Sequence, residues 1–79
     1  MKGLIFDLAR VLKPCLRYID LERLAKCVSK FIDGLEAGSV TPQDAAERVI
    51  DGCVPEEKRV DVFDQYYEDI VQVFRERTL

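Results

Sequence analysis

Four carboxylates in the C-terminal third of the chain have a spacing that could bind a metal. They are Glu57, Asp61, Asp64 and Glu68, and successive members are four, three and four residues apart. On a helix these offsets place all four side chains on one face, as in carboxylate bundles that hold divalent ions. The chain has no histidine to complete such a site, and no second segment offers a comparable row. We therefore interpret the row as a solvated outer face, and we predict no metal site and no cofactor.

The three cysteines, Cys15, Cys27 and Cys53, lie far apart in the sequence. No CxxC pair occurs, so the spacing of a structural zinc site is missing. Each cysteine lies in or next to an apolar helical run, which favours a role as a small buried side chain. Their number and spacing also favour a reduced, cytoplasmic protein. Ser29 and Ser39 have no histidine to activate them, which excludes a serine hydrolase.

A stripe of large apolar and aromatic side chains near the C-terminus is the candidate partner-binding surface. Its members are Phe63, Tyr66, Tyr67, Ile70 and Phe74. Adjacent tyrosines point in different directions on a helix, so at least one of them is expected at the edge of the core. Two interpretations remain open: the stripe packs into the core, or part of it stays exposed. Pairing of two copies, or binding of another protein, would bury an exposed strip and add stability that a small core lacks.

The composition fits one small helical domain over residues 1–79. Apolar residues make up 48% of the chain, which is enough for a globular core. A formal net charge of −3 argues against nucleic acid as a partner, because phosphate contacts need a basic face. The apolar run after Met1 is too short for a signal peptide or a membrane span. We therefore expect a soluble cytoplasmic protein that does not bind membranes.

Periodicity and capping signals predict four helices in an antiparallel, all-α bundle. Their expected ranges are residues 2–13, 19–37, 42–52 and 56–77. Asp20 and Thr41 fit the N-cap position, and Pro42 fits the first helical position after Thr41. Gly38 can adopt the left-handed conformation that ends a helix. Local signals thus agree with one another along most of the chain.

The expected core draws on all four helices. It comprises Leu8, Leu12, Leu24, Val28, Phe31, Ile32, Val49, Ile50, Phe63, Tyr67, Ile70 and Phe74. Residues 3–8 allow a second prediction, because a short apolar run interrupted only by Asp7 fits a buried strand as well as a helix. Such a strand would have to pair with another chain. We favour the helix.

The residues around Asp7 resemble a known catalytic motif. The stretch KGLIFDLARVL, residues 2–12, is similar to the first motif of haloacid dehalogenase (HAD) superfamily hydrolases, in which a strand ends in an aspartate nucleophile. Residues 35–49, LEAGSVTPQDAAERV, look similar to part of the helical cap of those enzymes. The resemblance implies that Asp7 would be the nucleophile of a phosphohydrolase that uses Mg²⁺.

The sequence also departs from the HAD pattern. Ala9 stands where phosphatases of the family usually carry a second aspartate, and Arg10 stands in place of a glycine. The later Ser/Thr, Lys and acidic motifs are missing before Leu79. Two hypotheses follow. The first is a non-catalytic helical module, a cap-like relic of a HAD-type phosphatase that acts by self-association or protein binding. The alternative is an N-terminal piece of a HAD-type hydrolase whose core comes from a longer chain.

Overall fold

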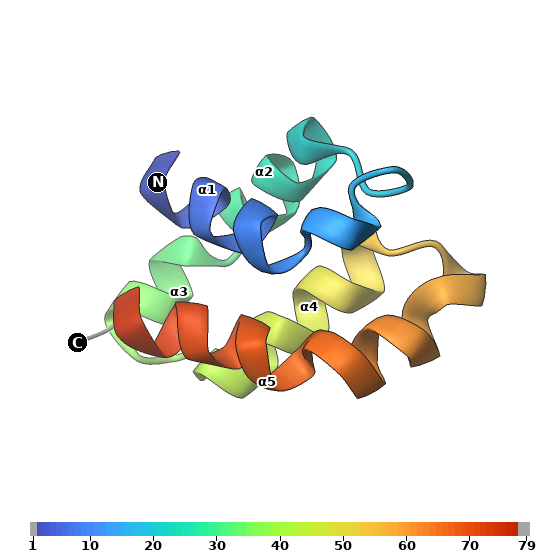
Figure 1. Ribbon diagram of the computed structural model, residues 1–79. Coiled ribbons are helices and arrows are strands. Elements are labelled where there is room, and N and C mark those ends of the chain that lie inside the picture. Colours follow the sequence, from blue (N-terminus) through green and yellow to red (C-terminus); the bar gives the residue numbers. More distant parts are fainter. Residues whose placement is uncertain (1, 78–79) are drawn as a thin grey trace.

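The computed structural model describes residues 2–77, and within them the chain forms five α-helices and no strand (Figure 1). The helices are α1 (Lys2–Val11), α2 (Leu21–Ser29), α3 (Ile32–Ala37), α4 (Pro42–Cys53) and α5 (Arg59–Arg77). Two 3-10 turns connect them: η1 (Lys13–Cys15) and η2 (Glu56–Lys58). The all-α prediction is confirmed, and so is the helix that we favoured over a strand at residues 3–8.

Both predicted N-caps form. The side chain of Asp20 accepts a hydrogen bond of 2.9 Å from the backbone N–H of Glu22 at the start of α2. Thr41 Oγ1 accepts a bond of 3.1 Å from the backbone N–H of Asp44, and Pro42 is the first residue of α4. Each cap satisfies a backbone donor that has no partner within its own helix.

The prediction of one continuous helix over residues 19–37 is wrong, because the chain turns between α2 and α3. The backbone N–H groups of Lys30 and Phe31 bond three residues back, to Cys27 and Val28, instead of four. The hydroxyl of Ser29 bonds to the carbonyl of Lys26 at 2.7 Å. These local bonds compete with the α-helical pattern, and Phe31 leaves the helical conformation (φ −128°, ψ 0°).

The helices enclose a single core, to which α4 and α5 contribute five buried residues each. The longest helix is α5. It packs against α4 and α1, and α2 packs against α4 and α1 in turn. In Figure 1, α1 and α5 lie side by side and run in opposite directions. At the centre the ring of Phe74 is fully buried and contacts Phe31 edge to face, with centroids 5.7 Å apart and planes at 65°. This contact ties the last helix to the turn between α2 and α3.

Most of the predicted core is buried, with three exceptions. Ile32 and Tyr67 are only partly buried and pack against the outside of the core. Phe63 is 43% exposed, so its assignment to the core is wrong. The reason is geometric: α4 and α1 cover one side of α5, and Phe63 lies near the start of α5, at the edge of the side that α4 covers.

Gly38 ends α3 in the left-handed conformation, with φ of +85°. The backbone N–H of Ser39 then reaches the carbonyl of Gly34 at 2.8 Å, a pattern typical of helix ends. A Cβ atom at position 38 would meet no atom within 4 Å, so the backbone conformation alone restricts the residue.

We predict that Gly38→Ala lowers the free energy of unfolding by roughly 1–2 kcal/mol, because alanine disfavours the left-handed region. Gly38→Asn is the matched control and should lose clearly less, since asparagine tolerates this conformation. Urea unfolding followed by circular dichroism measures both. Equal losses for the two variants would contradict a backbone origin of the effect.

Candidate functional site

The exposed part of α5 carries an apolar surface of three side chains. Val60, Phe63 and Tyr67 follow one another at offsets of three and four, which places them on one helix face. Val60 is 71% exposed and Phe63 43%. The rings of Phe63 and Tyr67 are stacked, with centroids 4.5 Å apart and planes at 28°. We call these three residues the α5 surface. Exposed aromatic rings held in a fixed arrangement are typical of protein-binding sites.

Acidic side chains surround the α5 surface. Asp64 and Glu68 lie on α5 itself, and three exposed carboxylates come from α4: Asp44, Glu47 and Asp51. Partial burial raises the pKa of Tyr67, and the carboxylates of Glu47, Glu68 and Asp44 raise it further. This pKa shift places the negative charges of α4 close to the α5 surface.

Arg59 lies beside Val60 and Phe63, and its side chain is bound to the protein backbone. Its Nε donates to the carbonyl of Val54 at 3.1 Å, and its Nη2 donates to the carbonyl of Asp51 at 2.9 Å. The guanidinium thereby binds carbonyl groups at the C-terminal end of α4, the end that favours positive charge. Together with Ile50 and Asp51 it lines a shallow groove beside Val60 and Phe63.

The five residues predicted to bind a partner do not lie together on one surface. Ile70 and Phe74 are fully buried in the core, so they present no side chain to a partner. Tyr66 lies on another side of α5, where it lines a pocket with Tyr18. Phe63 and Tyr67 stay at the surface. A hundred degrees of rotation between adjacent helical positions accounts for this division.

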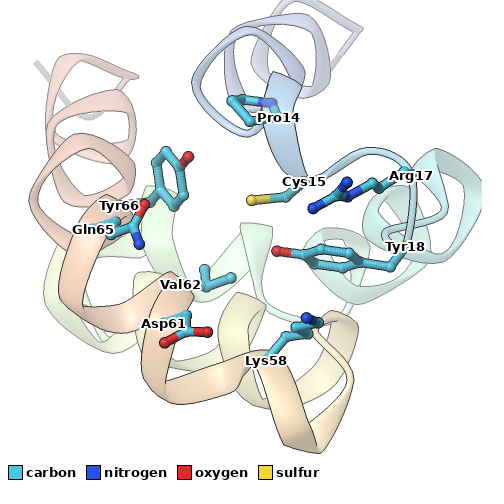
Figure 2. Close-up of a pocket in the computed structure, with 9 residues that line it drawn as sticks. All are labelled: Pro14, Cys15, Arg17, Tyr18, Lys58, Asp61, Val62, Gln65 and Tyr66. Atoms are coloured by element: carbon cyan, nitrogen blue, oxygen red, sulfur yellow. The ribbon is translucent and has the colours of Figure 1, made fainter.

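The pocket beside Tyr66 lies between the turn η1 and the first half of α5 (Figure 2). Nine residues line it: Pro14, Cys15, Arg17, Tyr18, Lys58, Asp61, Val62, Gln65 and Tyr66. The sulfur of Cys15 and the hydroxyl of Tyr18 point into it (Figure 2). Lys58 Nζ lies 5.7 Å from the centre of the Tyr18 ring, a cation–π contact. With about 190 Å³ of space, the cavity is smaller than the pockets that bind drug-sized ligands.

Tyr18 and Cys15 interact with each other in this pocket. The Tyr18 hydroxyl donates a hydrogen bond to the Cys15 sulfur, and this bond raises the pKa of Tyr18 to about 12, with a further contribution from desolvation. Desolvation also raises the pKa of Tyr66, with smaller contributions from Cys15 and Asp69. The structure thus gives the buried Cys15 a polar neighbour that its sequence position did not indicate.

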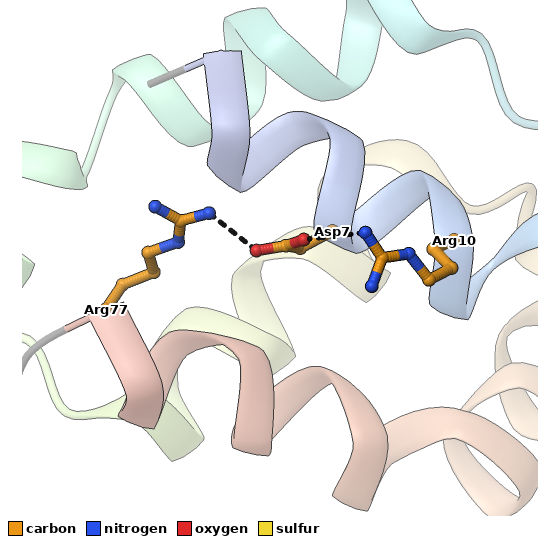
Figure 3. A network of polar contacts seen from close by, with 3 residues as sticks. All are labelled: Asp7, Arg10 and Arg77. Carbon is orange, nitrogen blue, oxygen red and sulfur yellow. Dashed lines mark hydrogen bonds and ion pairs between the residues drawn. The ribbon is translucent and has the colours of Figure 1, made fainter.

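Asp7 lies on α1 and forms two ion pairs (Figure 3). Its Oδ2 accepts a bond of 2.6 Å from Arg77 Nη2 at the end of α5, and its Oδ1 lies 3.4 Å from Arg10 Nη2. The HAD resemblance implies a strand that ends at Asp7, whereas the structure has helix from Lys2 to Val11. In this position Asp7 joins α1 to α5.

The four carboxylates of the predicted outer face, Glu57, Asp61, Asp64 and Glu68, are all exposed. Among residues 2–77, the structure contains no group of three or more histidine, cysteine, aspartate or glutamate side chains suited to a metal ion.

The cysteines reveal one contact that the sequence spacing did not indicate. Cys27 on α2 and Cys53 at the end of α4 lie within hydrogen-bonding reach of each other. The residues are separated by a helix and two turns, so their proximity depends on how α2 packs against α4.

Comparison with models of known protein families, with curated proteins and with solved structures found no match. The resemblance to HAD enzymes therefore stays a prediction from the sequence. Within residues 2–77, none of the helices combines the length and the apolar character needed to span a membrane.

We predict that Cys15→Ala lowers the pKa of Tyr18 from about 12 towards its ordinary value of 10, because the variant removes the hydrogen-bond acceptor. Absorbance of tyrosinate at alkaline pH measures the titration. In the parent protein the raised pKa favours the folded state fully below pH 10, and this contribution is lost as the pH rises towards 12. Cys27→Ala is the control, and an identical titration of both variants would contradict the contact.

We expect Asp7→Asn to lower the free energy of unfolding by no more than about 1 kcal/mol, since both ion pairs of Asp7 are partly exposed to solvent. A double-mutant cycle with Arg77→Gln measures the coupling, which should weaken at high salt. The same variant tests the catalytic alternative: we expect no magnesium-dependent hydrolysis of an aryl phosphate by either protein. Hydrolysis that disappears in Asp7→Asn would establish Asp7 as a nucleophile.

Proposed function

We propose that this chain is a non-catalytic helical module that binds a protein partner through the α5 surface. The observation that supports the proposal is the exposed Phe63, stacked on the partly buried Tyr67 and next to the exposed Val60. Apolar side chains are more stable when they are removed from water. A partner that covers these side chains would therefore gain binding free energy from their burial. The cytoplasmic location expected from the sequence belongs to the same proposal.

The charges around the α5 surface favour a basic partner. Five carboxylates lie near it, on α4 and α5, and Arg59 is bound to backbone carbonyls. A second copy of this chain would bring the same acidic rim against itself, which is unfavourable. An amphipathic helix with apolar side chains on one face and lysine or arginine beside them would instead match both the apolar centre and the acidic rim.

The shape of the surface also fits a helix. Val60, Phe63 and Tyr67 form a ridge at helical spacing, and the shallow groove lined by Ile50 and Arg59 runs beside it. Side chains of a second helix pack into such a groove when the two helices cross at a common angle. The apolar anchors of the partner would therefore contact Phe63 and Tyr67, and its basic side chains would reach Asp51, Asp64 and Glu68.

The alternative of a HAD-type hydrolase requires Asp7 to face a substrate at the end of a strand. The helical backbone at Asp7 and its ion pairs with Arg77 and Arg10 favour the binding module instead. Descent from a cap-like segment of such an enzyme remains a proposal that rests on residues 2–12 and 35–49 alone, and partner binding does not depend on it.

We predict that Phe63→Ser weakens binding of a synthetic amphipathic peptide, with leucine on one helical face and lysine on the other, at least tenfold. The variant removes an aromatic anchor and breaks the stack with Tyr67. Isothermal titration calorimetry measures the affinity, which should fall with rising salt. Phe6→Ser is the matched control, because Phe6 is an even more exposed phenylalanine (69% against 43% for Phe63) and lies on α1.

Three outcomes would contradict parts of this proposal. Equal loss of affinity in Phe63→Ser and Phe6→Ser would show that the α5 surface is not the binding site. Equal affinity for a peptide with glutamate in place of lysine would show that the acidic rim does not select the partner. A dimer seen by light scattering that dissociates in Phe63→Ser would identify a second copy as the occupant, as the sequence-based prediction of self-association has it.

A further inference from the structure

We propose that Cys27 and Cys53 form a peroxide-reactive thiol pair, in which Cys27 attacks a hydroperoxide and Cys53 then closes a disulfide between α2 and α4. The inference is independent of the α5 surface. It rests on the contact between the two thiols and on how their surroundings differ.

The two thiols contact each other at the place where α2 packs on α4. Cys27 Sγ donates to the carbonyl of Arg48, which precedes Cys53 on α4, at 3.4 Å. Cys53 Sγ donates to the carbonyl of Arg23, one turn before Cys27 on α2, at 3.7 Å. Each thiol thus reaches across to the helix of the other. To form a disulfide bond of about 2 Å, the two thiols must turn from these carbonyl groups towards each other.

Gly52 provides the space for the Cys27 thiol. A Cβ atom at position 52 would lie 2.8 Å from Cys27 Sγ, closer than any real contact of this kind. The residue next to Cys53 in the chain is therefore restricted by the sulfur of Cys27. We take this fit between Gly52 and Cys27 as a second observation that the thiols are positioned together.

The surroundings assign different roles to the two thiols. Cys53 is buried, whereas Cys27 is partly open to solvent and so accessible to a small oxidant. The neighbouring Cys53 thiol, together with the nearby charges of Lys30 and Arg23, lowers the pKa of Cys27 to about 7, although burial opposes this. The interaction with Cys27 raises the pKa of Cys53, and burial adds to the effect. Cys27 is therefore the thiol of the pair that ionises near neutral pH, and the thiolate is the nucleophile.

The reaction balances with hydrogen peroxide as the oxidant. The Cys27 thiolate attacks one peroxide oxygen, the O–O bond breaks, and the leaving hydroxide takes up a proton to form water, which leaves a sulfenic acid on Cys27. Cys53 then attacks the Cys27 sulfur, the S–S bond forms, the S–O bond breaks, and the hydroxyl leaves as water with the proton of Cys53. The two thiols together lose two electrons, and the peroxide gains them.

The test uses the full chain treated with hydrogen peroxide and analysed by non-reducing mass spectrometry and peptide mapping. We expect one intramolecular disulfide between Cys27 and Cys53, with Cys15 still free. In the Cys53→Ser variant, the reaction should stop at a sulfenic acid on Cys27, which dimedone traps. Cys27→Ser should lose thiol at least tenfold more slowly, and Cys15→Ser, the matched control, should behave as the parent.

A second measurement follows the rate of iodoacetamide alkylation at Cys27 against pH. The charged and titratable groups that face this thiol are Arg23 on α2, Lys30 directly after α2, and Cys53 on α4. We expect a rise centred near pH 7, which moves to higher pH in Lys30→Gln and in Cys53→Ala. A disulfide that includes Cys15, a disulfide between chains, or a midpoint at the value of an ordinary thiol would overturn the proposal.

Discussion

The burial of Phe74 is the interaction on which the rest of this small fold depends. Its ring is fully enclosed and meets Phe31 edge to face, so one residue of α5 holds the turn at which α2 and α3 separate. Helices as short as α1, α2 and α3 are not stable alone in water, because nucleation costs more than a few hydrogen bonds return. They form here because each of them places leucine in the same core: Leu8 from α1, Leu24 from α2 and Leu35 from α3.

The parts of the fold that depend on neighbouring residues could be predicted from the sequence. Thr41 and Asp20 cap helices because their side chains bond to backbone groups only two or three residues away. The break at Phe31 could not be predicted, because the apolar spacing of Val28, Phe31 and Leu35 continues through it. That spacing is the same whether the helix is straight or turns, so the apolar pattern does not reveal the break.

The candidate site shows the same limit. Sequence spacing identified the aromatic stripe of α5, but the division between core and surface depends on which side α4 and α1 cover. Phe74 and Phe63 are both phenylalanines of one stripe, and they have opposite surroundings. The contact between Cys27 and Cys53 had no local signal at all, since two different helices bring the thiols together. A site that is formed by side chains from two helices can be recognised only once the packing of those helices is known.

The position of the Arg77–Asp7 ion pair has a practical consequence for how the molecule can be handled. It fixes the start of α1 and the end of α5 at the same end of the protein (Figure 1). Val60 lies at the opposite end of α5, which at the usual helical rise is about 25 Å away. A dye, an affinity label or a fused domain joined at either terminus would therefore leave the exposed aromatic end unobstructed. The protein can be immobilised by its termini with that end facing the solution.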